Sequence, residues 1–116
     1  MGQQMERRQH ERFTVVDLVL YEQATNRPIG KVVNVSARGL LVISSKEYKV
    51  GKEIDFFIPF TKTVQGLVKF EFKGAVKWST QSDENPAQMK IGMEFADNPD
   101  LQTMFIQQLV KVYGAS

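Results

Sequence analysis

Apolar and polar residues alternate through most of the chain, and this pattern predicts β-strands. Alternation places every second side chain in a core and the others in solvent. It predicts six strands, over residues 15–22, 29–35, 40–44, 53–59, 68–79 and 89–95. Turn-forming residues separate them, and the second and third strands are expected to pair as a hairpin through residues 36–39. Strands of this number tend to close into a barrel.

The fifth strand has the most regular pattern. Its apolar face is expected to consist of Val68, Phe70, Phe72, Gly74, Val76 and Trp78. We expect a bend near Gly74, because glycine inside a strand tolerates bulges and close backbone approach. Pro59 is expected to weaken the end of the fourth strand, since proline has no N–H to donate.

The apolar period changes near the C-terminus and predicts one amphipathic helix. Asn98 is a suitable N-cap, Pro99 suits the first helical position, and Gly114 is a plausible stop. The apolar residues recur at helical spacing: Leu101, Met104, Phe105, Leu109, Val112 and Tyr113. This stripe is expected to cover the open end of the barrel, in preference to filling a groove on a partner.

Composition narrows the possible functions. A chain of 116 residues that is 42% hydrophobic suits a single core, and a formal charge of +2 means that any anion site must be local. The chain has no cysteine and a single histidine, His10, so it cannot form disulfides and has few ligands for a metal centre. It also offers little for catalysis by a Ser/His or Cys/His pair, so we do not expect an enzyme. No apolar run approaches a membrane span or a signal peptide, which predicts a cytoplasmic protein.

Three arginines precede the first strand. Arg8 and Arg12 are four residues apart and Arg7 adjoins them, so guanidinium groups could grip an anion from more than one side. Position alone favours the alternative of a solvated, charged terminus. His10 lies inside this segment and is interpreted as a spacer or a solvated residue.

A second polar group lies where the second strand ends. Asn34 and Ser36 are two residues apart, so in an extended segment both side chains leave on one face and can address the edge of a planar group. Gly39 stands where the chain turns into the next strand. Taken alone, these residue types also suit an ordinary hairpin corner.

Together the two segments resemble the PilZ domain, a family of bacterial cyclic-di-GMP receptors. Its signatures, RxxxR followed by (D/N)xSxxG, match residues 8–12 and 34–39, and residues 74–78 and 91–95 look like its late strands. The resemblance covers roughly residues 7–110. It implies a six-stranded antiparallel β-barrel with a C-terminal α-helix, in agreement with the strands predicted above.

The resemblance also implies roles for individual residues. Arg8 and Arg12 would bind the phosphates and guanine edges, Asn34 and Ser36 would hydrogen-bond a guanine, and Gly39 would let the backbone come close. Guanine fits this chemistry, because its adjacent O6 and N7 acceptors match a guanidinium fork.

Two positions depart from the commonest family pattern. Arg38 replaces a residue that is often glycine, and would crowd the ligand or add a phosphate contact. In the family, an additional arginine such as Arg7 goes with binding of a stacked dinucleotide dimer.

The sequence therefore predicts a cyclic-di-GMP receptor without a cofactor that signals to a downstream protein partner. Residues 1–12 would be a flexible ligand-binding segment, and residues 13–114 one barrel domain with its helix. One alternative is a PilZ-like adaptor that binds no nucleotide. Another is a single-stranded nucleic-acid binder, because Lys69, Lys73 and Lys77 share one face of a strand, although the nearby phenylalanines have the spacing of core residues.

Overall fold

The computed structural model describes residues 11–96 and 99–115, with side chains described for 11–96 and 104–115. The strands in this part of the chain are β1 (Phe13–Thr14), β2 (Val19–Glu22), β3 (Arg27–Val35), β4 (Gly39–Ser44), β5 (Glu53–Val64), β6 (Leu67–Gln81) and β7 (Met89–Phe95). Helix α2 (Pro99–Tyr113) follows. It begins at the expected proline and ends just before Gly114, whereas the expected N-cap, Asn98, lies outside the described residues.

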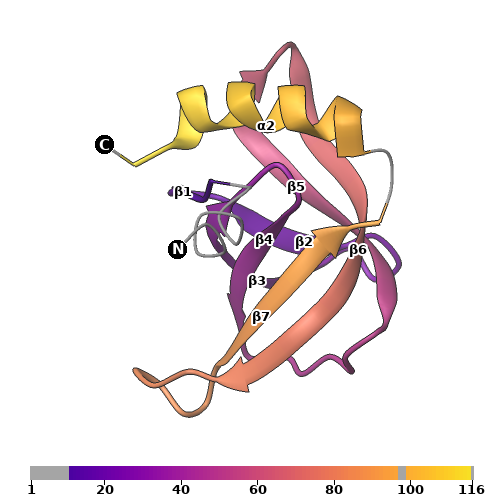
Figure 1. Ribbon diagram of the computed structural model, residues 1–116, viewed down its shortest axis with the longest axis vertical. Coiled ribbons are helices and arrows are strands. Elements are labelled where there is room, and N and C mark those ends of the chain that lie inside the picture. Colours follow the sequence, from indigo (N-terminus) through magenta and orange to yellow (C-terminus); the bar gives the residue numbers. More distant parts are fainter. Residues whose placement is uncertain (1–10, 97–98, 116) are drawn as a thin grey trace, which may run out of the picture.

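Six of the strands form a closed antiparallel barrel, as predicted (Figure 1). The order around it is β3-β2-β5-β6-β7-β4, and β4 pairs back with β3 to close the ring. The β3–β4 pairing is the hairpin that the sequence predicted. The short strand β1 pairs with the end of β3, beyond the residues that pair with β2.

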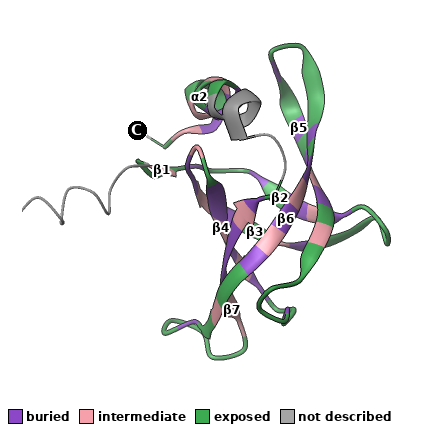
Figure 2. Ribbon diagram, turned by 45° about the vertical axis from the view of Figure 1, so that its right-hand side comes forward, coloured by how far each residue is buried: buried purple, intermediate pink, exposed green. Residues whose placement is uncertain are grey.

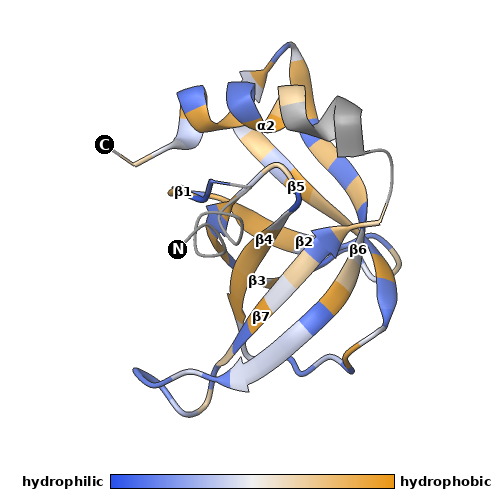
Figure 3. Ribbon diagram, viewed as in Figure 1, coloured by the Kyte–Doolittle hydropathy of each residue, from blue (hydrophilic) through white to orange (hydrophobic). Residues whose placement is uncertain are grey.

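The core fills the barrel and continues under the helix. Buried residues recur along the strands (Figure 2), and most of them are hydrophobic (Figure 3). Helix α2 lies across one end, where Phe105 contacts Phe70 with ring centroids 4.7 Å apart. Phe105, Leu109 and Tyr113 of the predicted stripe therefore cover the barrel, whereas Met104 and Val112 are exposed and the Leu101 side chain lies outside the described residues. No helical segment in the described residues is both long and apolar enough to cross a membrane.

The predicted first strand is interrupted. Residues 15–18 separate β1 from β2, and Asp17 adopts a left-handed backbone conformation with φ of 62°. Both pieces still follow the same edge of β3, because the Val15 N–H bonds to the Val33 carbonyl and the Val32 N–H to the Leu18 carbonyl. The alternating sequence extends across this break, so the prediction of one strand over residues 15–22 was wrong.

Strand β5 continues past Pro59 to Val64, contrary to expectation. The Asp55 carbonyl bonds to the N–H of Gln23, so alternate residues of β5, including Pro59, direct their backbone groups toward the β2 edge. On that edge β2 pairs only with Phe56 and Phe57. The missing N–H of Pro59 therefore costs no ladder hydrogen bond.

The register shift in β6 lies between Val76 and Trp78, two residues beyond Gly74, near which the sequence predicts a bend. A second register shift lies in β3, between Val32 and Asn34. A β-bulge adds one residue to a strand, so the side chains beyond it change faces.

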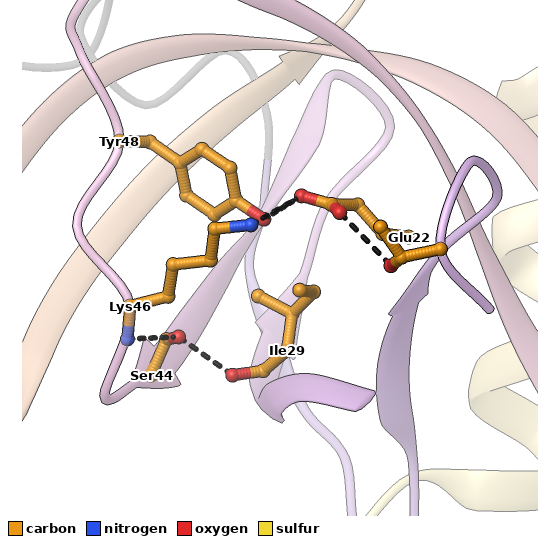
Figure 4. Close-up of polar contacts among 6 residues, drawn as sticks. Glu22, Ile29, Ser44, Lys46 and Tyr48 are labelled. Carbon is orange, nitrogen blue, oxygen red and sulfur yellow. Dashed lines mark hydrogen bonds and ion pairs between the residues drawn. The ribbon is translucent and has the colours of Figure 1, made fainter. Parts of the chain in front are cut away.

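A polar cluster built around the buried residues Glu22 and Tyr48 joins β2 to the segment that follows β4 (Figure 4). The Glu22 carboxylate accepts hydrogen bonds from Lys46 Nζ at 2.8 Å and from the Tyr48 hydroxyl at 2.6 Å. These two bonds lower the pKa of Glu22 from 4.5 to about 2. Burial, together with the adjoining Glu22 carboxylate, raises the pKa of Tyr48 above its ordinary value. The carboxylate is thus ionised and paired inside the protein, which ties residues 46–48 to the barrel wall.

Candidate functional site

The bulges of β3 and β6 direct two side chains out of the barrel. Val32 and Val76 are fully buried, so simple alternation would send Asn34 and Trp78 inward as well. Beyond the bulges, Asn34 is half-buried and Trp78 is 38% exposed. The prediction that Trp78 belongs to the inward face was therefore wrong, and the bulge supplies the reason.

The described end of the N-terminal arginine segment meets the second predicted segment at one place. Arg12 Nη1 donates a hydrogen bond to Asn34 Oδ1 at 3.2 Å, across 22 positions of sequence. Beside this pair is a cavity of about 350 Å³, within the range of small-molecule sites. We call it the site cavity; it is lined by Arg12, Ser36, Arg38, Gly39, Leu40, Lys77, Trp78, Gly92, Met93 and Glu94.

Ser36 organises the turn at the rim of this cavity. Its Oγ accepts hydrogen bonds from the N–H groups of Arg38 and Gly39, both at 3.2 Å, and the Ser36 N–H bonds to the Gly39 carbonyl at 2.8 Å. The Ser36 hydroxyl proton is held only by a long 3.5 Å contact to that carbonyl. Ser36 therefore fixes the turn and retains a proton that can be donated elsewhere.

Gly39 is required by strand packing. A Cβ at this position would lie 1.9 Å from the Met93 carbonyl oxygen, so any side chain would separate β4 from β7. The resemblance had suggested that Gly39 lets the backbone approach a ligand, and the structure adds this reason within the fold.

Trp78 forms a flat surface on the cavity wall. Its indole covers Gly92 so closely that a Cβ on Gly92 would lie 2.3 Å from ring atoms Cε2 and Nε1. Glycine at 92 thus lets the ring lie against the backbone of β7 while remaining partly exposed. An exposed indole of this kind can stack on a nucleobase.

The charges around the cavity are predominantly positive. Arg12, Arg38 and Lys77 line it, and Glu94 is the only acidic residue among the described lining residues. Lys77 Nζ lies 3.7 Å from Glu94 Oε1, and both side chains are about half exposed. The cavity therefore suits an anionic ligand that also has a planar, polar group.

The cavity gathers Arg12, Ser36, Arg38 and Gly39, with Asn34 bonded to Arg12. The predicted ligand residues Arg7 and Arg8, together with His10, lie outside the described residues. Sequence reasoning had not assigned Trp78, Gly92 or Glu94 to a site, and had considered Lys77 only for the alternative of a nucleic-acid binder. Gly92 was the available signal, because glycine within a strand often marks close approach of another group.

The structure weakens the case for a nucleic-acid strand site on β6. Phe70 and Phe72 are buried, so they offer no stacking surface. Lys69, Lys73 and Lys77 form ion pairs with Glu71, Asp55 and Glu94 respectively. These lysines are therefore partly neutralised by acids on the same surface.

Comparison with protein families identifies one match. The family model described as PilZ domain matches residues 6–112. Comparison with curated proteins gave no match.

Three solved structures have a similar fold. The Bacillus subtilis inhibitor of motility MotI/DgrA has a TM-score of 0.69 at 18% identity, over 91% of this chain and 50% of that one. The PilZ domain of Escherichia coli YcgR with c-di-GMP has a TM-score of 0.62 at 12% identity, over 91% and 90%. YcgR in complex with c-di-GMP has a TM-score of 0.66 at 12% identity, over 91% and 46%. The chain thus spans about half the length of MotI/DgrA.

Proposed function

The chain belongs to the PilZ domain family, and we propose that it is a receptor that binds cyclic-di-GMP in the site cavity. The observation that carries this proposal is the convergence of Arg12, Asn34 and the Ser36–Gly39 turn beside the exposed Trp78 indole. Structural neighbours with c-di-GMP bound have the same fold. The proposal for this chain rests on its own side chains.

Each part of the ligand has a counterpart in the cavity. Arg12 and Arg38 supply guanidinium groups for phosphate oxygens or for guanine O6 and N7. Trp78 supplies a stacking surface for one base. Asn34 and the Ser36 hydroxyl offer polar atoms to a base edge. Arg38 lies on the cavity wall, so we assign it a ligand contact.

Arg7 and Arg8 complete the proposed clamp. Four extended residues span at most about 14 Å, so a segment attached at Arg12 can bring the Arg8 side chain over the cavity. We propose that residues 1–12 close over the ligand, because phosphate contacts would offset the cost of ordering them. Arg7 would then favour a stacked pair of dinucleotides.

Output through a partner protein is the second part of the proposal. On helix α2, Met104 is 67% exposed and Val112 is 39% exposed, whereas Phe105, Ile106, Leu109 and Tyr113 are buried. This exposed apolar pair favours a protein contact. It is also the observation that favours the alternative of an adaptor without nucleotide.

Calorimetric titration of cyclic-di-GMP tests the proposal. Three variants should each weaken binding about tenfold or more. Arg12→Ala removes a charge-assisted bond, Asn34→Ala an oriented amide, and Trp78→Ala a stacking surface. Arg27→Ala is the matched control, because Arg27 begins β3 and is not part of the cavity lining. Equal binding by all variants, or none by the wild type, would overturn the receptor assignment.

The same titration measures the number of ligands bound. Two dinucleotides bound per chain, reduced to one by Arg7→Ala, would support the stacked pair.

A further inference from the structure

The carboxylate of Glu94 is the unusual group in the site cavity. The other charged side chains in the lining, Arg12, Arg38 and Lys77, are cations that suit a ligand with two phosphates. A carboxylate beside them weakens the attraction for that ligand. Its presence is favourable only if the ligand also carries hydrogen-bond donors that the carboxylate can accept.

We propose that Glu94 selects guanine by accepting hydrogen bonds from the N1–H and the 2-amino group. This inference rests on the proposed function. Guanine presents these two donors side by side on one edge, and two carboxylate oxygens match them in the same plane. Adenine presents an unprotonated N1 on the corresponding edge and has no 2-amino group, so it would face the carboxylate with a lone pair.

The position of Glu94 suits this role. It lies two residues after Gly92 on β7, so the two positions share one face of the strand, about 7 Å apart. Trp78 covers Gly92, and Gly39 of the Ser36–Gly39 turn pairs with Glu94 across the sheet. A base stacked on Trp78 therefore lies within reach of the Glu94 carboxylate.

The Glu94 carboxylate is also able to accept further hydrogen bonds. Lys77 is 3.7 Å from it, beyond the usual range of a hydrogen bond, and the Glu94 side chain is 47% exposed. The Lys77 ammonium thus lies near the carboxylate while leaving its oxygens able to accept hydrogen bonds from a ligand. The pair can exchange water for a base edge without breaking a buried bond.

The direction in which Glu94→Gln changes the affinity for cyclic-di-GMP distinguishes this role from that of a carboxylate that does not contact the ligand. A bystander carboxylate only repels the phosphates, so its removal would tighten cyclic-di-GMP binding. A carboxylate that receives guanine donors contributes to affinity, so its replacement by an amide should weaken binding about tenfold. The adenine ligand cyclic-di-AMP should bind the variant more tightly than it binds the wild type.

The experiment measures dissociation constants of both dinucleotides for the wild type, Glu94→Gln and Glu71→Gln. Glu71 is the matched control, an exposed carboxylate paired with Lys69 on β6 and absent from the cavity lining. We expect the preference for guanine to fall at least tenfold in Glu94→Gln and to persist in Glu71→Gln. Binding by the wild type with an unchanged preference in Glu94→Gln would overturn only the role of Glu94. Absence of wild-type binding would overturn the proposed function as well.

Discussion

The backbone N–H of Val16 donates a hydrogen bond to the carbonyl oxygen of Tyr113 at 3.0 Å. Close by, the Ala115 N–H bonds to the Thr14 carbonyl at 2.9 Å. On its other side, Thr14 pairs with Asn34 of β3. Residues 14–16 therefore lie between β3 and the end of helix α2, so the chain that leads away from Arg12 is hydrogen-bonded to both the barrel and the helix.

Tyr113 also links the helix to β5, and its hydroxyl should contribute to stability. The hydroxyl donates to the Lys62 carbonyl and accepts from the Lys62 N–H, both at 2.9 Å. Tyr113→Phe should lower the free energy of unfolding by about 1–3 kcal/mol, because it leaves both backbone groups without this partner while keeping the ring. Urea denaturation measures the change. Tyr21→Phe, in a half-buried ring stacked on Phe57, is the control and should change stability by less. Equal losses in the two variants would contradict the role of the Tyr113 hydroxyl.

The Glu22 cluster predicts a pH-dependent contribution to stability. The Lys46 and Tyr48 bonds lower the pKa of Glu22 to about 2, so its contribution is fully present above the unfolded value near 4.5 and is lost as pH falls toward 2. Glu22→Gln should cost on the order of 2 kcal/mol at pH 7, a figure reduced because Lys46 is half exposed. The gap from the wild type should narrow between pH 5 and about 2, which urea unfolding at several pH values would reveal. A gap that stays constant over this range would refute the assignment.

Sequence patterns revealed the barrel because most strands are amphipathic along their whole length. The patterns could not locate the bulges, because the residues on either side of each bulge are two apart, as in an unbroken strand. This holds for Val32 and Asn34 in β3 and for Val76 and Trp78 in β6. Only the register with the neighbouring strands shows that one residue is extra. The same limit explains why the break at Asp17 went unpredicted.

The candidate site was predictable on one side only. Arg12, Asn34, Ser36 and Gly39 lie in two short motifs, and the resemblance brought those motifs together. The opposite wall comes from β6 and β7, where Trp78 resembled a core residue. Its role depends on a bulge and on contact with Gly92, and both are tertiary features.

Gly92→Ala should disturb the site more than the fold. The added methyl group would meet the Trp78 ring, and because Trp78 is partly exposed, the ring can be displaced outward. We expect a shift in tryptophan fluorescence, which reports on Trp78 alone because the chain has a single tryptophan, and weaker ligand binding. Gly66→Ala is the control, because strain at its φ of 77° in the β5–β6 turn should cost about 1 kcal/mol without altering the emission. Unchanged emission in Gly92→Ala would argue against the packing of Trp78 on this glycine.

Ligand binding at Arg12 should be detectable at the end of the helix. If cyclic-di-GMP holds Arg12 beside Asn34, it also stabilises the pairing of residues 14–16 with their neighbours, because these residues follow Arg12 directly. The amides of Val16 and Ala115, which bond across to the other segment, should then exchange with solvent more slowly in the complex. The Ser82 amide, bonded to the Gln88 carbonyl in the β6–β7 loop, provides an internal control and should not change. Hydrogen exchange followed by NMR measures all three amides in one sample. The same spectra contain the Val15 amide, which bonds to the Val33 carbonyl of β3. Slower exchange at Val15 with no change at Val16 and Ala115 would mean that ordering stops at the barrel, and the helix would then not sense the ligand through this contact.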